Sequence, residues 1–136
     1  MTEPSSALAA AALYAGLHAL ILAWLGWSVV RIRMREKVLI GDAGNPRLIR
    51  AMRGMSNFAE YAPVALLLLF AAGALGTPAW VVHVFGVALT AARLMHGWHF
   101  MQADAPGWQR AGGTMVTMTV LLLGGLGVAA HALVSL

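Results

Sequence analysis

Residues 58–75 read FAEYAPVALLLLFAAGAL, and the segment 64–70 within them is apolar throughout. A transmembrane β-strand needs only about 10 residues and alternates apolar with polar side chains, so this unbroken run argues against a barrel strand. The stretch is close to the ~20 residues that a helix needs to cross a hydrocarbon core about 30 Å thick. It therefore predicts a transmembrane helix.

Three further apolar stretches of similar length are present, at 7–30, 78–98 and 112–134. Together the stretches predict an all-α integral membrane protein, a four-helix bundle in which residues 1–136 form a single four-span domain. The composition agrees, because the chain is 60% hydrophobic and 10% charged, whereas soluble domains carry about 25% charged residues. The chain has no cysteine, which excludes disulfides, zinc–thiolate sites and a cysteine nucleophile.

The turns between the apolar stretches are of two kinds. Residues 41–46, GDAGNP, interrupt the helical pattern after the first stretch, and Pro46 suits the first turn of the next helix. Residues 104–107, DAPG, break the chain after the third stretch. By contrast, residues 76–78, GTP, form a tight turn without any charge.

The cationic residues lie almost entirely beside the first and third connections, at one end of the predicted bundle. The positive-inside rule places this end in the cytoplasm and both termini outside it. Basic residues in turns between apolar runs favour membrane orientation over nucleic-acid binding, so we expect the lipid bilayer and no nucleic acid as a partner. These cations are Arg31, Arg33, Arg35, Lys37, Arg47, Arg50, Arg53 and Arg110.

Alanines recur every four residues along the first stretch. Such a strip of small side chains lets membrane helices approach closely, and it indicates either helix association or simply an alanine-rich protein. The strip consists of Ala7, Ala11, Ala15, Ala19 and Ala23.

Several polar residues fall inside the predicted spans. Burying a charged group in a membrane costs free energy, so a structural or functional role is expected for each. Steps of three and four residues place them on one face of each helix, at a similar depth in the second and third spans. At this depth we expect a buried ion pair between Arg93 and Glu60. The residues are Arg53, Asn57 and Glu60 in the second span, with Arg93 and His96 in the third.

Cations, an amide and one carboxylate at one level suit a small zwitterionic or polyanionic ligand, because guanidinium groups bind carboxylates bidentately. The alternative is that these charges only tie the helices together. His96 and His99 are three residues apart, but without a second ligand cluster we predict no metal site.

These residues also carry a family resemblance. The sequence resembles the MAPEG family (membrane-associated proteins in eicosanoid and glutathione metabolism), in particular its bacterial members and the microsomal glutathione transferases. The resemblance covers essentially the whole chain, and the loop at 41–46 is similar to that of bacterial members. The two motifs that carry it are Arg53-x-x-x-Asn57-x-x-Glu60-Tyr61-x-Pro63 and Arg93-x-x-His96-Gly97.

The resemblance implies a homotrimer in a bacterial inner membrane, with glutathione bound as co-substrate between subunits near the cytoplasmic face. It implies that Arg110 stabilises the glutathione thiolate and that Arg31 or Arg33 contacts a glutathione carboxylate. The chain departs from the family pattern at His96, where several members have tyrosine. The residues to which glutathione binding carries over are Arg53, Asn57, Glu60, Tyr61, Arg93, His96 and Arg31.

The expected function is that of a membrane-bound glutathione transferase or peroxidase, which conjugates or reduces lipophilic small molecules. The alternative is a non-enzymatic membrane protein that binds a small anionic ligand or serves as a scaffold.

Overall fold

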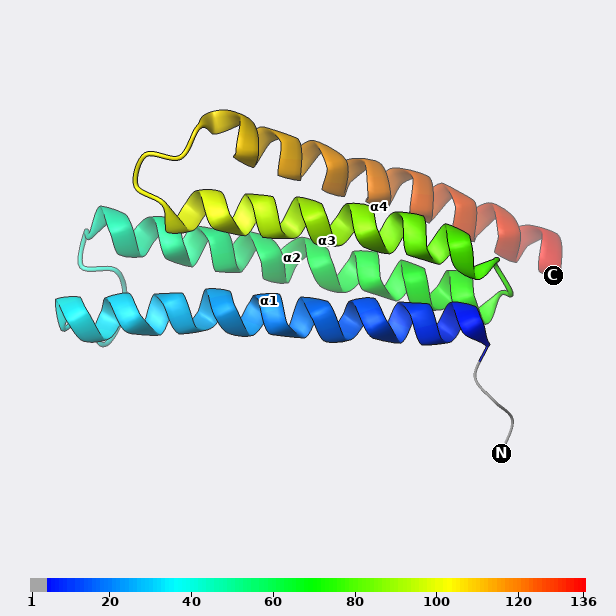
Figure 1. Ribbon diagram of the computed structural model, residues 1–136, viewed down its shortest axis with the longest axis horizontal. Coiled ribbons are helices and arrows are strands. Elements are labelled where there is room, and N and C mark those ends of the chain that lie inside the picture. Colours follow the sequence, from blue (N-terminus) through cyan, green and yellow to red (C-terminus); the bar gives the residue numbers. More distant parts are fainter. Residues whose placement is uncertain (1–4) are drawn as a thin grey trace.

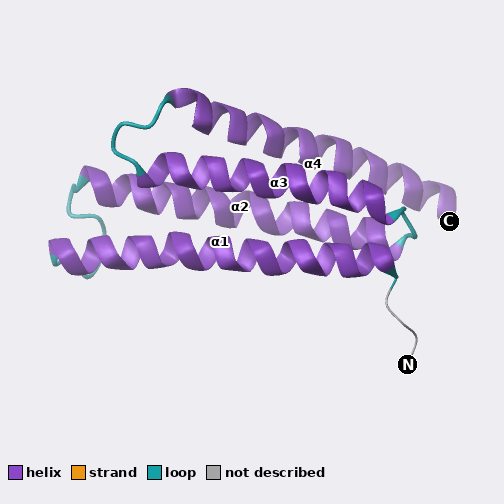
Figure 2. Ribbon diagram, in the orientation of Figure 1, coloured by secondary structure: helices purple, strands orange, loops and turns teal. Residues whose placement is uncertain are grey.

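The computed structural model describes residues 5–136, which form four helices: α1 (Ser6–Glu36), α2 (Pro46–Ala74), α3 (Ala79–Met101) and α4 (Gly107–Ser135). Successive helices run in opposite directions, so the start of α1 and the end of α4 lie at the same end of the bundle (Figure 1). The described residues contain no strand (Figure 2). All four helices are long and apolar enough to cross a membrane, which confirms the predicted four-helix membrane bundle.

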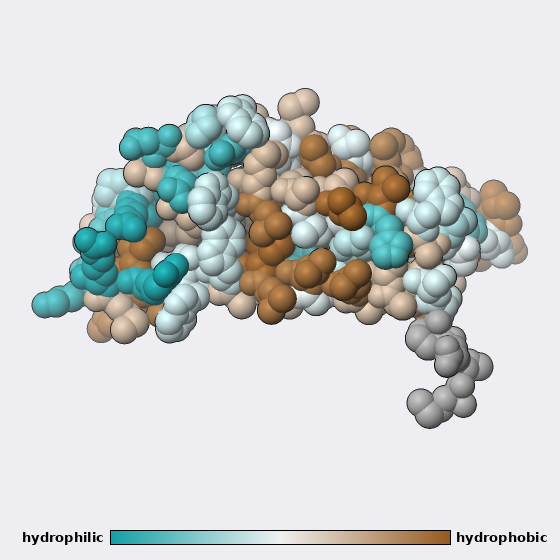
Figure 3. All heavy atoms as spheres, viewed as in Figure 1, coloured by the Kyte–Doolittle hydropathy of each residue, from teal (hydrophilic) through white to brown (hydrophobic). Residues whose placement is uncertain are grey.

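The helices extend beyond the apolar stretches at the end that holds the α1–α2 and α3–α4 loops. Hydrophilic side chains gather at this end, and hydrophobic side chains are prominent along the middle of the bundle (Figure 3). We call it the basic end, because every Lys and Arg outside the spans lies in or beside these two loops. The charge asymmetry that the sequence predicts is therefore present in the fold.

The α1–α2 loop is closed by local hydrogen bonds. Gly41 and Gly44 adopt φ values of 69° and 68°, which glycine reaches without steric cost. The Nη1 atom of Arg33 donates to the carbonyl oxygen of Gly41 at 2.8 Å. Asn45 then caps α2, since its Oδ1 accepts from the backbone N–H groups of Arg47 and Leu48. The predicted break at 41–46 is confirmed, with Pro46 at the first helical position.

The core lies mainly among the first three helices. α1 packs against α2 and α3, whereas α4 packs against α3 and α2 and makes no contact with α1. One of the buried clusters joins Ile21 and Leu25 of α1 to Phe58 and Ala62 of α2. Along α4 few side chains are buried, so most of its surface faces outward.

The alanine strip of α1 is only partly used within the chain. Ala7 and Ala11 are buried, but Ala19 and Ala23 are exposed. A four-residue step overshoots one turn of a 3.6-residue helix by about 40°, so a strip of this period winds around the helix. Its first half packs inside the protomer, and its second half faces outward.

Tyr14 locks α1 to α3 in the half of the bundle away from the basic end. Its hydroxyl is 2.9 Å from Nδ1 of His83, and its ring lies directly over Gly86. A Cβ atom at position 86 would occupy the same space as that ring. The absence of a side chain at Gly86 therefore allows the close approach of the two helices.

Gly86→Ala should destabilise the fold by about 1–3 kcal/mol, because an added methyl group overpacks the contact with Tyr14. The measurement is the free energy of unfolding in mixed micelles. Gly125→Ala is the matched control, since a Cβ atom there meets nothing within 4 Å. Equal stability of the two variants would contradict the tight contact.

Candidate functional site

A pocket of about 310 Å³ opens at the basic end between α2, the end of α3 and the start of α4. Its size is at the lower end of the roughly 300–1,000 Å³ typical of small-molecule sites. Five of its six lining side chains are polar or charged. They are Arg53, Ser56, Asn57 and Glu60 of α2, Phe100 of α3 and Arg110 of α4.

The face of α2 explains why these residues line one pocket. Arg53, Ser56 and Glu60 follow one another at steps of three and four residues, so they share a side of the helix. All three are exposed, whereas Phe58 and Ala62 on the other side are buried in the core. Asn57 stands at the boundary between the two sides and is half-buried.

The charges in the pocket are not neutralised by one another. Arg53 and Arg110 supply two cations and Glu60 supplies one carboxylate. Among residues 5–136, the only oppositely charged pair within 4.0 Å is Arg35 with Glu36, far along α1. Separate positive and negative groups on one wall suit a zwitterionic ligand, whose own charges can meet each of them.

Arg93 lies behind the pocket wall. Only 1% of this residue is exposed, and its Nη1 atom donates to Oδ1 of Asn57 at 3.1 Å. Our prediction of an ion pair between Arg93 and Glu60 is therefore wrong. Glu60 and Arg93 lie at a similar depth along their helices. However, Glu60 is on the outward side of α2, whereas Arg93 is turned into the bundle.

Asn57 thus connects the pocket with the buried charge. Its Oδ1 is occupied by Arg93, so its NH₂ group remains free to donate to a ligand. The Nε and Nη2 atoms of Arg93 are buried and have no hydrogen-bond partner in the described chain. Because a buried charge is costly when it is poorly paired, the bond to Asn57 matters for stability as well as for the site.

The remaining predicted residues lie outside the pocket. His96 is 3% exposed and its ring contacts that of Phe100, with centroids 5.0 Å apart. Tyr61 is half-buried and does not line the pocket. Arg31 lines a second pocket beside α1. Of the predicted residues, the fold therefore brings Arg53, Asn57, Glu60 and Arg110 together in one cavity.

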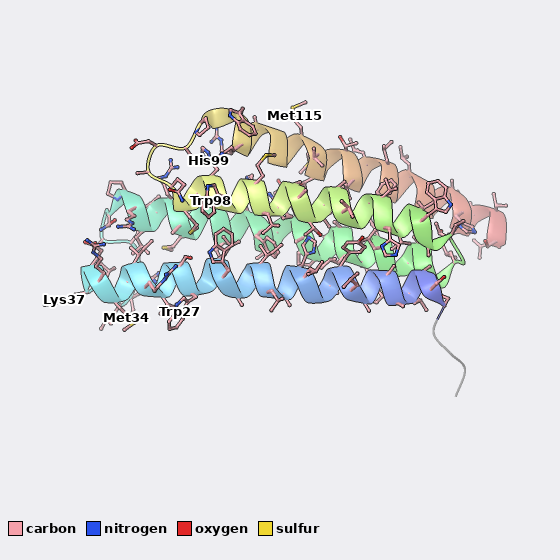
Figure 4. The ribbon with its side chains drawn as sticks, in the orientation of Figure 1. Trp27, Met34, Lys37, Trp98, His99 and Met115 are labelled. Atoms are coloured by element: carbon pink, nitrogen blue, oxygen red, sulfur yellow. The ribbon has the colours of Figure 1, made fainter. Side chains whose placement is uncertain are left out.

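Three hydrogen bonds at the end of α3 bring Arg110 to this position. The Nη2 atom of Arg50 donates to the carbonyl oxygens of His99 at 3.1 Å and Gln102 at 2.9 Å. The Nδ1 atom of His99 lies 3.2 Å from the carbonyl oxygen of Pro106, where the loop leads into α4 (Figure 4). α4 begins at the next residue, so these contacts fix the turn that carries Arg110.

Sequence reasoning missed Ser56 and Phe100 as pocket residues. Ser56 could have been found, because it shares the helical face of Arg53 and Glu60. Phe100 shares a helical face with Arg93 and His96, but spacing alone does not bring it to the pocket, since its position depends on the close approach of α3 to Gly54 of α2, where an added Cβ would collide with it. No group of three His, Asp or Glu that could hold a metal occurs in the described part of the chain.

Comparison with known proteins finds a family and two relatives that match this sequence. The profile of the MAPEG family matches residues 11–130. The chain is also similar to the inner membrane protein YecN from two strains of Escherichia coli, at 38% identity over 112 residues. The matched region covers 82% of this chain and 85% of YecN. All pocket residues fall inside the matched range of the family profile.

Asn57→Leu should lower the free energy of unfolding by roughly 1–3 kcal/mol or more, because it leaves the Arg93 guanidinium buried without its partner. The double variant Asn57→Leu/Arg93→Leu should recover much of that loss, since no buried charge remains. Ser56→Ala is the control from the same pocket. A double variant as unstable as the sum of both single variants would show that the two side chains are not coupled.

Proposed function

Since the chain belongs to the MAPEG family, we propose that it is a glutathione-dependent membrane enzyme that conjugates or reduces lipophilic electrophiles. The single observation that carries the proposal is that Arg110 shares a pocket with Arg53, Asn57 and Glu60, although it is far from them in the sequence. The family resemblance assigns glutathione binding to Arg53, Asn57 and Glu60, and stabilisation of the thiolate to Arg110.

The charges of the pocket match those of glutathione, which carries two carboxylates, one ammonium group and a thiol. Arg53 binds a carboxylate through its planar guanidinium. Glu60 binds the ammonium group, and Asn57 donates its free NH₂ group to a carbonyl or carboxylate oxygen. Arg93, buried behind the pocket wall, holds Asn57 in place and adds positive potential behind it.

Arg110 acts on the thiol. A free thiol has a pKa near 8.5, and an adjacent guanidinium lowers that pKa by favouring the thiolate. The thiolate sulfur attacks the electrophilic carbon and forms a thioether, while the leaving group departs or the adduct takes up a proton. An electrophile dissolved in the bilayer is held beside the sulfur, so proximity adds to thiolate stabilisation.

The proposal places the protein in an inner membrane, as the name of the related YecN does for that protein. The basic end faces the cytoplasm and both termini lie outside it, in line with the positive-inside rule. In this orientation the pocket opens toward the cytoplasmic glutathione pool.

Arg53→Ala should weaken glutathione binding about tenfold to a hundredfold, because a hydrogen bond to a charged group contributes about 1.5–3 kcal/mol. Arg110→Ala should slow conjugation at neutral pH and restore it as the pH rises toward 8.5, since the thiol then ionises without help. The measurements are calorimetric binding of glutathione and its conjugation to a test electrophile by purified protein in detergent.

Lys37→Ala is the matched control, because this cation lies at the basic end but outside the pocket (Figure 4). Folded protein that binds glutathione without conjugating or reducing any electrophile would favour the non-enzymatic alternative. Protein that neither binds nor uses glutathione would overturn the proposal.

The proposal includes a homotrimer, in which Arg31 of one subunit reaches the pocket of the next. Within one protomer Arg31 lines a different cavity, whereas Arg33 is bonded to the carbonyl oxygens of its own loop. Of the two arginines, Arg31 is therefore the one free to contact glutathione.

Co-expression of an Arg31→Ala chain with an Arg53→Ala chain should restore part of the conjugation activity that each variant lacks alone. Mixed trimers would then contain sites in which Arg53 comes from one chain and Arg31 from its neighbour. Co-expression of Arg53→Ala with Arg110→Ala is the control, since both residues belong to the same protomer's pocket and no intact site arises. Failure of the first pair to complement would show that Arg31 does not act between subunits.

A further inference from the structure

Two buried polar side chains, one on α1 and one on α3, carry nitrogen atoms that no hydrogen bond within residues 5–136 uses. His18 is 1% exposed, and its Nε2 atom is buried without a partner there. Arg93 is equally buried, and its Nε and Nη2 atoms are unpartnered in the same way. Leaving a buried polar atom without a partner costs free energy, so native proteins bond nearly all of them to protein atoms or to ordered water.

The packing of α1 on α3 places these two side chains on facing sides of one seam. The two helices run in the same direction (Figure 1). Tyr14 lies over Gly86 and Leu25 lies against Gly97, so in both contacts the residue of α3 is numbered 72 higher than the residue of α1. Steps of four, three and four residues keep one face of a helix on its neighbour. The facing residues are Tyr14, His18, Ile21 and Leu25 of α1, and Gly86, Thr90, Arg93 and Gly97 of α3.

His18 and Arg93 are therefore about one helical turn apart across this seam. At a rise of about 1.5 Å per residue, their levels differ by roughly 4–5 Å. Both also contact the same stretch of α2. The ring of His18 packs near that of Phe58, with centroids 5.8 Å apart, and Arg93 donates to the side chain of the preceding residue, Asn57. The unpartnered atoms thus belong to two side chains that share one buried region.

The hydrogen bond on the other side of the His18 ring determines what its Nε2 atom can bind. The Nδ1 atom lies 2.8 Å from the carbonyl oxygen of Tyr14. A carbonyl oxygen only accepts, so Nδ1 carries the proton, and Nε2 of the neutral ring is an acceptor. Arg93 offers only donors. The missing partner is therefore a group that accepts from the guanidinium and donates to Nε2.

Neither hydroxyl of the described seam supplies this group. Thr90 lies level with His18, but its hydroxyl donates to the carbonyl oxygen of Gly86 at 2.7 Å. The hydroxyl of Tyr14 lies instead 2.9 Å from Nδ1 of His83. A water molecule meets both requirements, and buried waters in proteins typically make about three such hydrogen bonds. A chloride ion would accept from Arg93, but the lone pair of Nε2 would repel it.

We propose that one buried water molecule bridges His18 and Arg93, and that His18 is thereby a positioning residue for the candidate site. The water accepts from Nε or Nη2 of Arg93 and donates to Nε2 of His18. Arg93 is then held by α1 on one side and by Asn57 on the other, and Asn57 lines the pocket. The effect on glutathione rests on the proposed function, whereas the water bridge does not.

The bridge is tested without glutathione, by ¹⁵N NMR of the full-length protein labelled at histidine in lipid nanodiscs. The His18 signals are assigned by their loss in His18→Gln. They should show a protonated Nδ1, an unprotonated Nε2 and a cross peak from the ring to bound water. A ring protonated at both nitrogens would overturn the bridge in favour of an anion between two cations. A proton on Nε2 alone, or a ring without contact to water, would also overturn it.

A double-mutant cycle measures the coupling between the two side chains. His18→Phe keeps a ring against Phe58 but removes Nε2, so the unfolding equilibrium constant in mixed micelles should rise about tenfold. With Arg93→Leu already present, the same change should have an effect of about threefold or less, because no guanidinium remains to be bridged. Thr90→Val, at the same level of the seam, is the matched control. Additive effects of His18→Phe and Arg93→Leu, or an equal loss in Thr90→Val, would contradict the bridge.

Glutathione binding separates positioning from a purely structural role. In folded protein, His18→Phe should weaken calorimetric binding about threefold to tenfold. His18→Gln should bind nearly as tightly as the unaltered protein, because its side-chain oxygen replaces the acceptor. The pH dependence of conjugation should not change, since Arg110 is intact. Unchanged binding in His18→Phe, or no recovery in His18→Gln, would overturn the positioning role. If the unaltered protein binds no glutathione, the proposed function fails, and the NMR signals and the cycle still decide the bridge.

Discussion

In the interior of the bundle, a hydrogen bond from Arg93 to the side chain of Asn57 joins α3 to α2 at 3.1 Å. A guanidinium at this depth is expensive to bury, so the rotation of both helices is constrained by the need to keep it bonded. With Asn57 turned toward Arg93, the next polar positions of α2 face outward. Arg53 and Glu60 therefore line the wall of a pocket instead of pairing inside the bundle.

The end of α3 determines what faces that wall. Arg50 holds the last carbonyl groups of α3 against α2, and His99 contacts the loop before α4. These bonds bring Arg110 opposite Arg53, and they place Phe100 between the two cationic pockets of the basic end. The same short segment thus completes the proposed glutathione site and separates it from the second pocket, beside α1.

The cations at the basic end have different structural roles, although the positive-inside rule counts them all alike. Arg33 closes a loop, Arg50 caps a helix and Arg93 is buried as a tie between helices. Lys37 lines neither cationic pocket, whereas the remaining arginines line pockets in which no carboxylate lies within 4.0 Å of them, apart from the weak contact of Arg35 with Glu36. Their exposure leaves them available for anionic ligands. The charges at Arg53 and Arg110 face one cavity, and those at Arg31, Arg35 and Arg47 face another.

The sequence by itself determined the number of helices, the break at 41–46, the charged end and the polar face of α2, because each follows from local composition and helical spacing. It also determined the depth of each residue, through the rise of about 1.5 Å per residue. Only the tertiary structure decided that Arg93 pairs with Asn57 and not with Glu60, and that Arg110 joins the pocket. Both depend on the rotation of a helix about its axis, and in a membrane hydropathy does not set that rotation, since lipid is as apolar as the core.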